Sequence, residues 1–108
     1  MSNEAARLLE ALDLKVVAGG PNGRYPRAEP GPAQGYRYWA NMAEGQLRLG
    51  VQSNPKVALA PALIEQFRAQ GFQIMPASTE AFAWLGSDFD GAVDRGRATI
   101  SAIEAVLG

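Results

Sequence analysis

The sequence predicts an α+β domain in which a small, mainly antiparallel sheet is centred on a β-hairpin over residues 36–53, with helices packed on one face. Three observations lead to this expectation. The 108 residues have room for a single domain, and a hydrophobic share of 47% supplies one core. Two segments of alternating polarity flank the short connection Ala43-Glu44-Gly45, as in a hairpin. Apolar residues at helical spacing occur near both ends of the chain.

The N-terminal segment predicts a helix followed by a strand. Ser2 is a suitable N-cap, and alanine and leucine recur at helical spacing over residues 3–12. Residues 14–18 contain the β-branched pair Val16 and Val17 and are followed by two glycines, which is typical of a short strand that ends there.

Residues 19–35 are rich in glycine and proline. Pro26, Pro30 and Pro32 lack the backbone N–H that a helix or a strand ladder uses, so we expect a long loop without regular structure. Loops of this length in a compact domain are commonly functional or mobile.

The hairpin register follows from the polarity of its two strands, residues 36–42 and 46–53. A four-residue loop over residues 42–45 gives one coherent apolar face, whose expected pairs are Ala40 with Leu47, Tyr38 with Leu49 and Tyr36 with Val51. The same register places Arg37, Trp39 and Arg48 together on the opposite face. A three-residue loop mixes polar and apolar residues on both faces, so we favour the four-residue loop.

The C-terminal half predicts two helices around a strand and one ambiguous segment. Pro61 suits the first turn of a helix that runs to about residue 70, and residues 72–75 follow as a short strand. For residues 79–85 the sequence leaves two alternatives open, a short helix from the capping signal at Ser78 and a strand from the alternation of Phe82 and Trp84. Asp88 is expected to cap the last and longest helix, in which Gly96 falls near the buried stripe, where a neighbouring element can approach closely.

Composition argues against several classes of enzyme. The chain has no cysteine and no histidine, so disulfides, thiolate nucleophiles, cysteine–zinc sites and histidine-dependent triads are excluded. The N-terminus lacks the pattern of a secretory signal, and no apolar run reaches the roughly 18 residues of a membrane span. We therefore expect a cytoplasmic protein without a membrane partner, a metal or a cofactor.

Charge is distributed unevenly along the chain. Residues 1–14 carry a net charge of −2, residues 15–57 of +4 and residues 58–108 of −3, which sum to −1. A basic middle third is compatible with an anionic partner, and equally with internal charge complementarity.

Three acidic residues near the C-terminal helix offer an alternative function. Glu80, Asp88 and Asp90 lie within eleven residues, and paired carboxylates serve hydrolysis or a metal site when their separation is suitable. The spacing after Asp88 does not complete a calcium-binding loop, because Thr99 stands where a bidentate Glu is required. Helix capping is the preferred explanation of Asp88 and Asp90.

The remaining functional signal combines arginines with aromatic residues, and its members are Arg24, Tyr25, Arg27, Arg37, Trp39 and Arg48. With Trp39 exposed between arginines, these residues would suit an anionic or aromatic partner. The leading hypothesis is a non-catalytic adaptor, inhibitor or regulator with an anionic macromolecular partner, for which a protein is favoured and a nucleic acid stays an alternative. The alternatives are a small enzyme or ligand-binding domain that uses the acidic residues, and a structural subunit that self-associates through Trp39. In the competing structural interpretation, the loop or the first helix covers Trp39 and the arginines only surround it.

Overall fold

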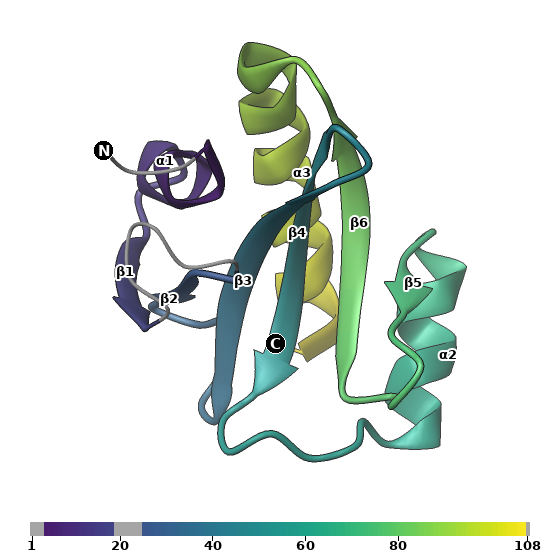
Figure 1. The fold of residues 1–108 in the computed structure, drawn as a ribbon. Helices are drawn as coiled ribbons and strands as arrows, with labels where there is room; N and C mark the ends of the chain where they lie inside the picture. The colour runs from purple at the N-terminus through teal and green to yellow at the C-terminus, as the bar shows by residue number, and fades with distance from the viewer. Residues whose placement is uncertain (1–3, 19–24, 108) are drawn as a thin grey trace.

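The computed structural model describes residues 4–18 and 25–107, and Figure 1 shows their arrangement. In chain order the helices and strands are α1 (Glu4–Ala11), β1 (Lys15–Ala18), β2 (Arg27–Glu29), β3 (Tyr36–Ala43), β4 (Gln46–Ser53), α2 (Pro61–Ala69), β5 (Gln73–Ile74), β6 (Glu80–Gly86) and α3 (Phe89–Leu107). The predicted α+β class is confirmed.

The strands form one antiparallel sheet in the order β1-β2-β3-β4-β6-β5. The hairpin of β3 and β4 lies at its centre, as expected, and α3 runs behind the sheet in the view of Figure 1. No helix of the described residues has the length and apolar character needed to cross a membrane.

The hairpin register differs from the prediction by two residues. Tyr38 pairs with Val51, Ala40 with Leu49 and Ala43 with Gln46, so the connecting turn is only Glu44-Gly45. Both turn residues have positive φ, 52° and 73°, as a type I′ turn requires, and such turns match the twist of the flanking strands. Because side chains alternate with a period of two, a shift of two residues preserves the predicted division of the hairpin into faces.

One further sequence prediction is wrong. Part of the segment 19–35 forms β2, which lies between β1 and β3 in the sheet. This three-residue strand fits between Pro26 and Pro30, and Pro26 contributes its carbonyl oxygen to the ladder by accepting a 3.2 Å hydrogen bond from Ala40 N. The segment 79–85, for which helix and strand were both open, is β6, because its pairing with residues 47–52 of β4 outweighs its local capping signal.

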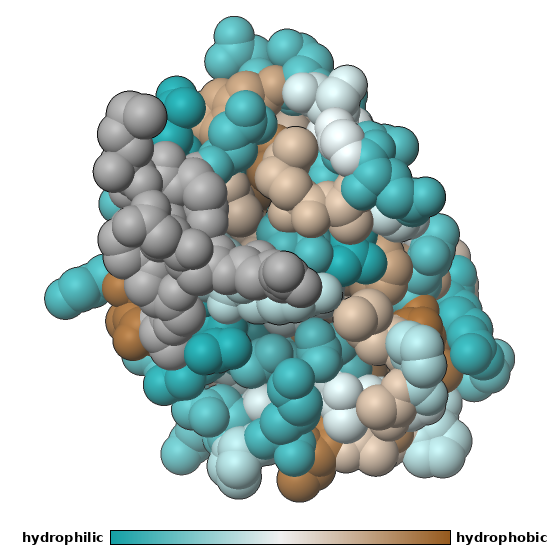
Figure 2. All heavy atoms as spheres, viewed as in Figure 1, coloured by the Kyte–Doolittle hydropathy of each residue, from teal (hydrophilic) through white to brown (hydrophobic). Residues whose placement is uncertain are grey.

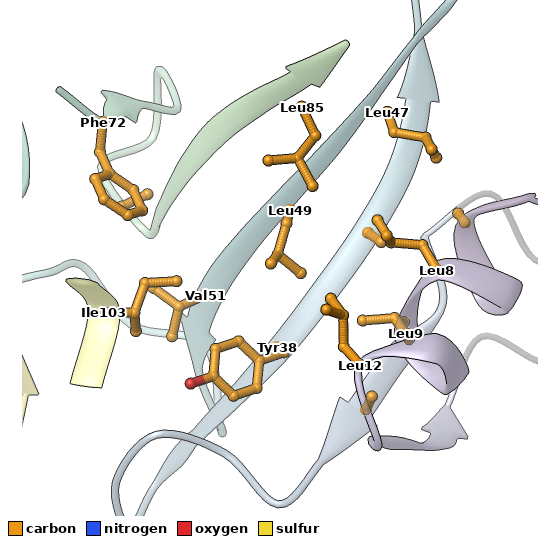
Figure 3. Packing of buried hydrophobic residues seen from close by; sticks show 14 of the residues in the cluster. Leu8, Leu9, Leu12, Tyr38, Leu47, Leu49, Val51, Phe72, Leu85 and Ile103 are labelled. Atoms are coloured by element: carbon orange, nitrogen blue, oxygen red, sulfur yellow. The ribbon is translucent and has the colours of Figure 1, made fainter. Parts of the chain in front are cut away.

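The hydrophobic core lies between the sheet and its helices (Figure 3). Tyr38, Leu49 and Val51 project from the hairpin toward Leu8 and Leu9 of α1, Leu12 just after it, and Ile103 of α3. As expected, Gly96 lies where another element approaches closely, since a Cβ atom there would stand 3.0 Å from Leu12 Cδ1.

Candidate functional site

The face of the sheet turned away from α1 and α3 gathers aromatic and polar side chains, and we call it the aromatic face. In the observed register its residues are Arg27 on β2, Arg37, Trp39 and Asn41 on β3, Arg48, Gly50 and Gln52 on β4, and Glu80, Phe82 and Trp84 on β6. Tyr25, just before β2, adds its ring to this face. Figure 2, drawn from the side opposite α3, shows hydrophilic residues interspersed with a few hydrophobic ones.

Trp39 is on the predicted face, but it is completely buried rather than exposed. It pairs across the ladder with Gly50, and the indole lies over that glycine, so that an added Cβ would stand only 2.4 Å from Trp39 Cε2 and Cζ2. The rings of Tyr25 and Phe82 flank the indole, with centroids 5.7 and 6.0 Å away. Because Gly50 has no side chain, the indole packs directly on its backbone, with the two rings beside it. The indole Nε1 is therefore buried, and no described residue accepts a hydrogen bond from it.

Arg48 is only 9% exposed and is enclosed by rings. Its guanidinium carbon lies 4.6 Å from the ring centroid of Phe82, 5.3 Å from that of Trp84 and 5.6 Å from that of Trp39. Cation–π attraction to such rings is worth about 0.5–2 kcal/mol each, depending on desolvation.

The hydrogen bonding of Arg48 is incomplete. Its Nε donates a 2.7 Å bond to Asn41 Oδ1, and in the described part of the chain its two Nη groups have neither an ion pair nor a hydrogen bond. The two Nη groups are not fully enclosed. Among the described residues, the polar atoms that are both enclosed and unpartnered are Tyr38 Oη and Trp39 Nε1, and the Nη atoms of Arg48 are not among them. A nearly buried guanidinium normally has a carboxylate or several acceptors, so this arrangement leaves donors available for an anion.

The other predicted basic residues differ in their surroundings. Arg37 donates from Nε to Glu29 Oε2 at 2.8 Å, so its charge already has a partner. Arg27 lies on the same face next to Trp39 in the register, and no described residue pairs with its guanidinium. Arg24 lies outside the described residues.

A pocket of about 230 Å³ opens at one end of the aromatic face, and its lining residues are Tyr25, Arg27, Gln52, Lys56, Met75 and Glu80. Lys56 Nζ is 2.9 Å from Glu80 Oε1, and Thr79 donates a 3.3 Å hydrogen bond to the same oxygen. Glu80 is nearly buried, whereas the Lys56 side chain is half exposed.

The three acidic residues of the alternative hypothesis do not come together. Glu80 begins β6 and Asp88 follows its end, so about 20 Å of extended strand separates them. Asp88 instead caps α3, where its Oδ2 accepts a 2.9 Å hydrogen bond from Gly91 N. Among residues 4–18 and 25–107, no group of three acidic side chains is placed to hold a metal ion.

Sequence reasoning missed the part of the site that β6, the end of β4 and the segment after β4 provide. Phe82, Trp84, Gln52 and Lys56 were not candidates, and Glu80 was considered only as an acid. The alternation of Phe82 and Trp84 was the available signal, because it places both rings on one face once the segment is a strand. Comparison with known protein families, curated proteins and solved structures gives no match to this chain.

Proposed function

We propose that this chain is a small non-catalytic binding protein whose aromatic face engages an anionic segment of a protein partner. The observation that supports this proposal most strongly is Arg48, a nearly buried guanidinium that has one neutral hydrogen-bond acceptor and forms no ion pair with any described residue. Removing a charge from water costs several kcal/mol, and cation–π contacts with three rings offset only part of that cost. An arriving carboxylate supplies the missing acceptors.

The chemistry of Arg48 favours a carboxylate as the recognised group. Guanidinium donors form a planar fork that matches two carboxylate oxygens, and such paired bonds are stronger where rings exclude water. The partly buried Trp84 ring stands beside the guanidinium and can contact the apolar part of the same side chain.

Charge favours a protein over a nucleic acid as the partner. The face holds Arg27, Arg37, Arg48 and nearby Lys56 together with two acids, and those acids already pair with Arg37 and Lys56. Two unpaired cations release few counterions from a nucleic acid, and the whole chain has a net charge of −1. The two cations that have no ion pair among the described residues, Arg27 and Arg48, are enough to bind one or two carboxylates on a protein surface.

The alternatives lose their main supports. Of the acidic residues proposed for catalysis, Glu80 lies far from Asp88 and Asp90. The self-association hypothesis relied on a second copy to bury Trp39. Within one chain Trp39 is already buried. Of the three acidic residues, Glu80 alone lines a pocket.

Capture experiments with three forms of the protein test the proposal. Wild type, Arg48→Gln and Arg97→Gln are immobilised and exposed to extract of the source cells, with and without nuclease, and retained proteins are quantified by mass spectrometry. Arg97 is an exposed arginine on α3, on the other side of the molecule, so its replacement matches the charge change.

The expected result is a set of acidic proteins retained by wild type and Arg97→Gln and lost with Arg48→Gln. The affinity of a purified partner should fall by about 30-fold or more, because loss of a desolvated charge pair costs 2–5 kcal/mol. Equal retention by all three forms would refute a role for Arg48. Loss of retention after nuclease treatment would identify a nucleic acid as the partner instead.

A further inference from the structure

We infer that the pocket at the end of the aromatic face is a separate binding site for a small organic monoanion, namely a carboxylate attached to a flat apolar body about the size of one aromatic ring. This inference concerns a free small molecule and does not depend on the protein partner proposed above. It rests on the charge, the unpartnered polar groups, the size and the position of the pocket.

The charge of the pocket fits one negative charge. Three lining side chains are ionised, and two of them, Lys56 and Glu80, neutralise each other through their 2.9 Å contact. Arg27 remains, and no ion pair or hydrogen bond links its guanidinium to any residue that the structure describes. The nearly buried Glu80 carboxylate would repel a dianion more strongly than a monoanion, so a monoanion is the better match.

Gln52 adds a second, independent indication of a ligand. Its side chain lines the pocket and the residue is only 7% exposed, yet its amide forms no hydrogen bond with any described residue. The Gln52 amide atoms are not themselves enclosed, because the enclosed, unpartnered polar atoms of the described residues are Tyr38 Oη and Trp39 Nε1, so the amide is accessible to a ligand from the pocket. An amide beside a guanidinium offers a donor for a carboxylate oxygen.

The size and apolar walls limit the rest of the ligand. A volume of about 230 Å³ exceeds the roughly 150 Å³ of an engineered cavity that accommodates benzene, so one ring with a carboxylate fits and a nucleotide does not. The Tyr25 ring and the Met75 thioether supply aromatic and polarisable surface for a flat apolar body.

The pocket is distinct from the environment of Arg48. Gln52 and Arg48 lie four residues apart on β4, which is about 13 Å along an extended strand. Trp39 lies over Gly50 between them, so one small molecule cannot contact both positions.

Benzoate is a suitable probe, with benzamide as its neutral analogue and acetate as the carboxylate without a ring. Each is titrated into the ¹⁵N-labelled full chain at neutral pH, and backbone amide shifts are followed by NMR. The same titration is run on Arg27→Gln, on Gln52→Leu, which keeps the side-chain size, and on the exposed control Arg97→Gln. The NMR spectrum of each variant also reports whether it is folded.

The inference predicts saturable benzoate binding with shifts at Gln52, Lys56, Met75 and Glu80, and clearly weaker binding of benzamide and acetate. Arg27→Gln should weaken benzoate binding by about tenfold or more through loss of the charged pair, and Gln52→Leu by a smaller factor. Arg97→Gln should bind as wild type does.

Four results would overturn the inference: no saturable shift with benzoate, benzamide binding as tightly as benzoate, acetate binding as tightly as benzoate, or shifts centred on Asn41, Arg48 and Trp84. Because no partner protein takes part, any of these results would leave the capture experiment on Arg48 unaffected.

Discussion

Replacing Gly50 by alanine tests the burial of Trp39, on which the shape of the aromatic face depends. The added Cβ would lie 2.4 Å from two indole carbons and 2.6 Å from the carbonyl oxygen of Ala81. Carbon atoms in good contact are about 3.5–4.0 Å apart, so the indole would have to move by roughly 1 Å. Trp39 is fully buried and the Ala81 oxygen belongs to the backbone of a central strand, so neither neighbour moves freely.

The expected cost of Gly50→Ala is about 2 kcal/mol of unfolding free energy. Overpacking of a core typically costs about 1–3 kcal/mol, and the three contacts under 3 Å place this site at the upper end. The lower entropy of an unfolded chain with alanine returns about 0.4–1 kcal/mol. For a domain of this size, a net loss near 2 kcal/mol lowers Tm by roughly 10 °C.

Urea denaturation followed by circular dichroism measures this loss directly. The same substitution in a Trp39→Phe background is the control, because the smaller ring leaves more room and the added methyl should cost less there. A midpoint for Gly50→Ala equal to that of wild type would show that the indole does not lie over Gly50, and the burial of Trp39 would then need another cause.

Three further predictions concern stability. Trp39→Ala should lose about 3–5 kcal/mol in urea denaturation because a fully buried indole is removed, whereas an exposed Trp39 would predict almost no change. Tyr38→Phe should raise stability by about 1 kcal/mol, since it removes a buried hydroxyl that has no hydrogen-bond partner; a loss of similar size would contradict this. Burial first, and the charge of Glu104 second, raise the pKa of the Tyr38 phenol. The unfolded chain therefore loses this proton at lower pH than the folded chain, so the stability of the wild type should decline above about pH 10. When melting is followed across alkaline pH, this part of the decline should be absent in Tyr38→Phe. Asp88→Ala should cost about 1 kcal/mol in thermal melting by removing the N-cap of α3, and Asp88→Asn, which can still cap, should cost less.

Local sequence signals predicted the elements that rely on periodicity and capping. Helical spacing located α1, α2 and α3, and Asp88 was identified correctly as the cap of α3. Such signals involve residues within one or two turns of each other, so they are readable without knowledge of distant contacts.

The hairpin shows where local reasoning stops. Alternation correctly divided its side chains into two faces, because a period of two is a property of any strand. The turn was wrong by two residues, since the polarity pattern alone does not distinguish registers that keep the same faces. The observed turn places a glutamate, Glu44, at positive φ, which an argument from glycine alone does not anticipate.

The fold class, the helices, the faces of the hairpin and the gathering of arginine with aromatic residues in the middle third are all readable from the amino-acid order. The burial of Trp39 and the enclosure of Arg48 beside it are not. Both depend on β6, which comes more than thirty residues later and brings Phe82 and Trp84 onto the same face. Burial is a property of neighbours, and the neighbours here are set by strand pairing between distant segments rather than by any pattern within one of them.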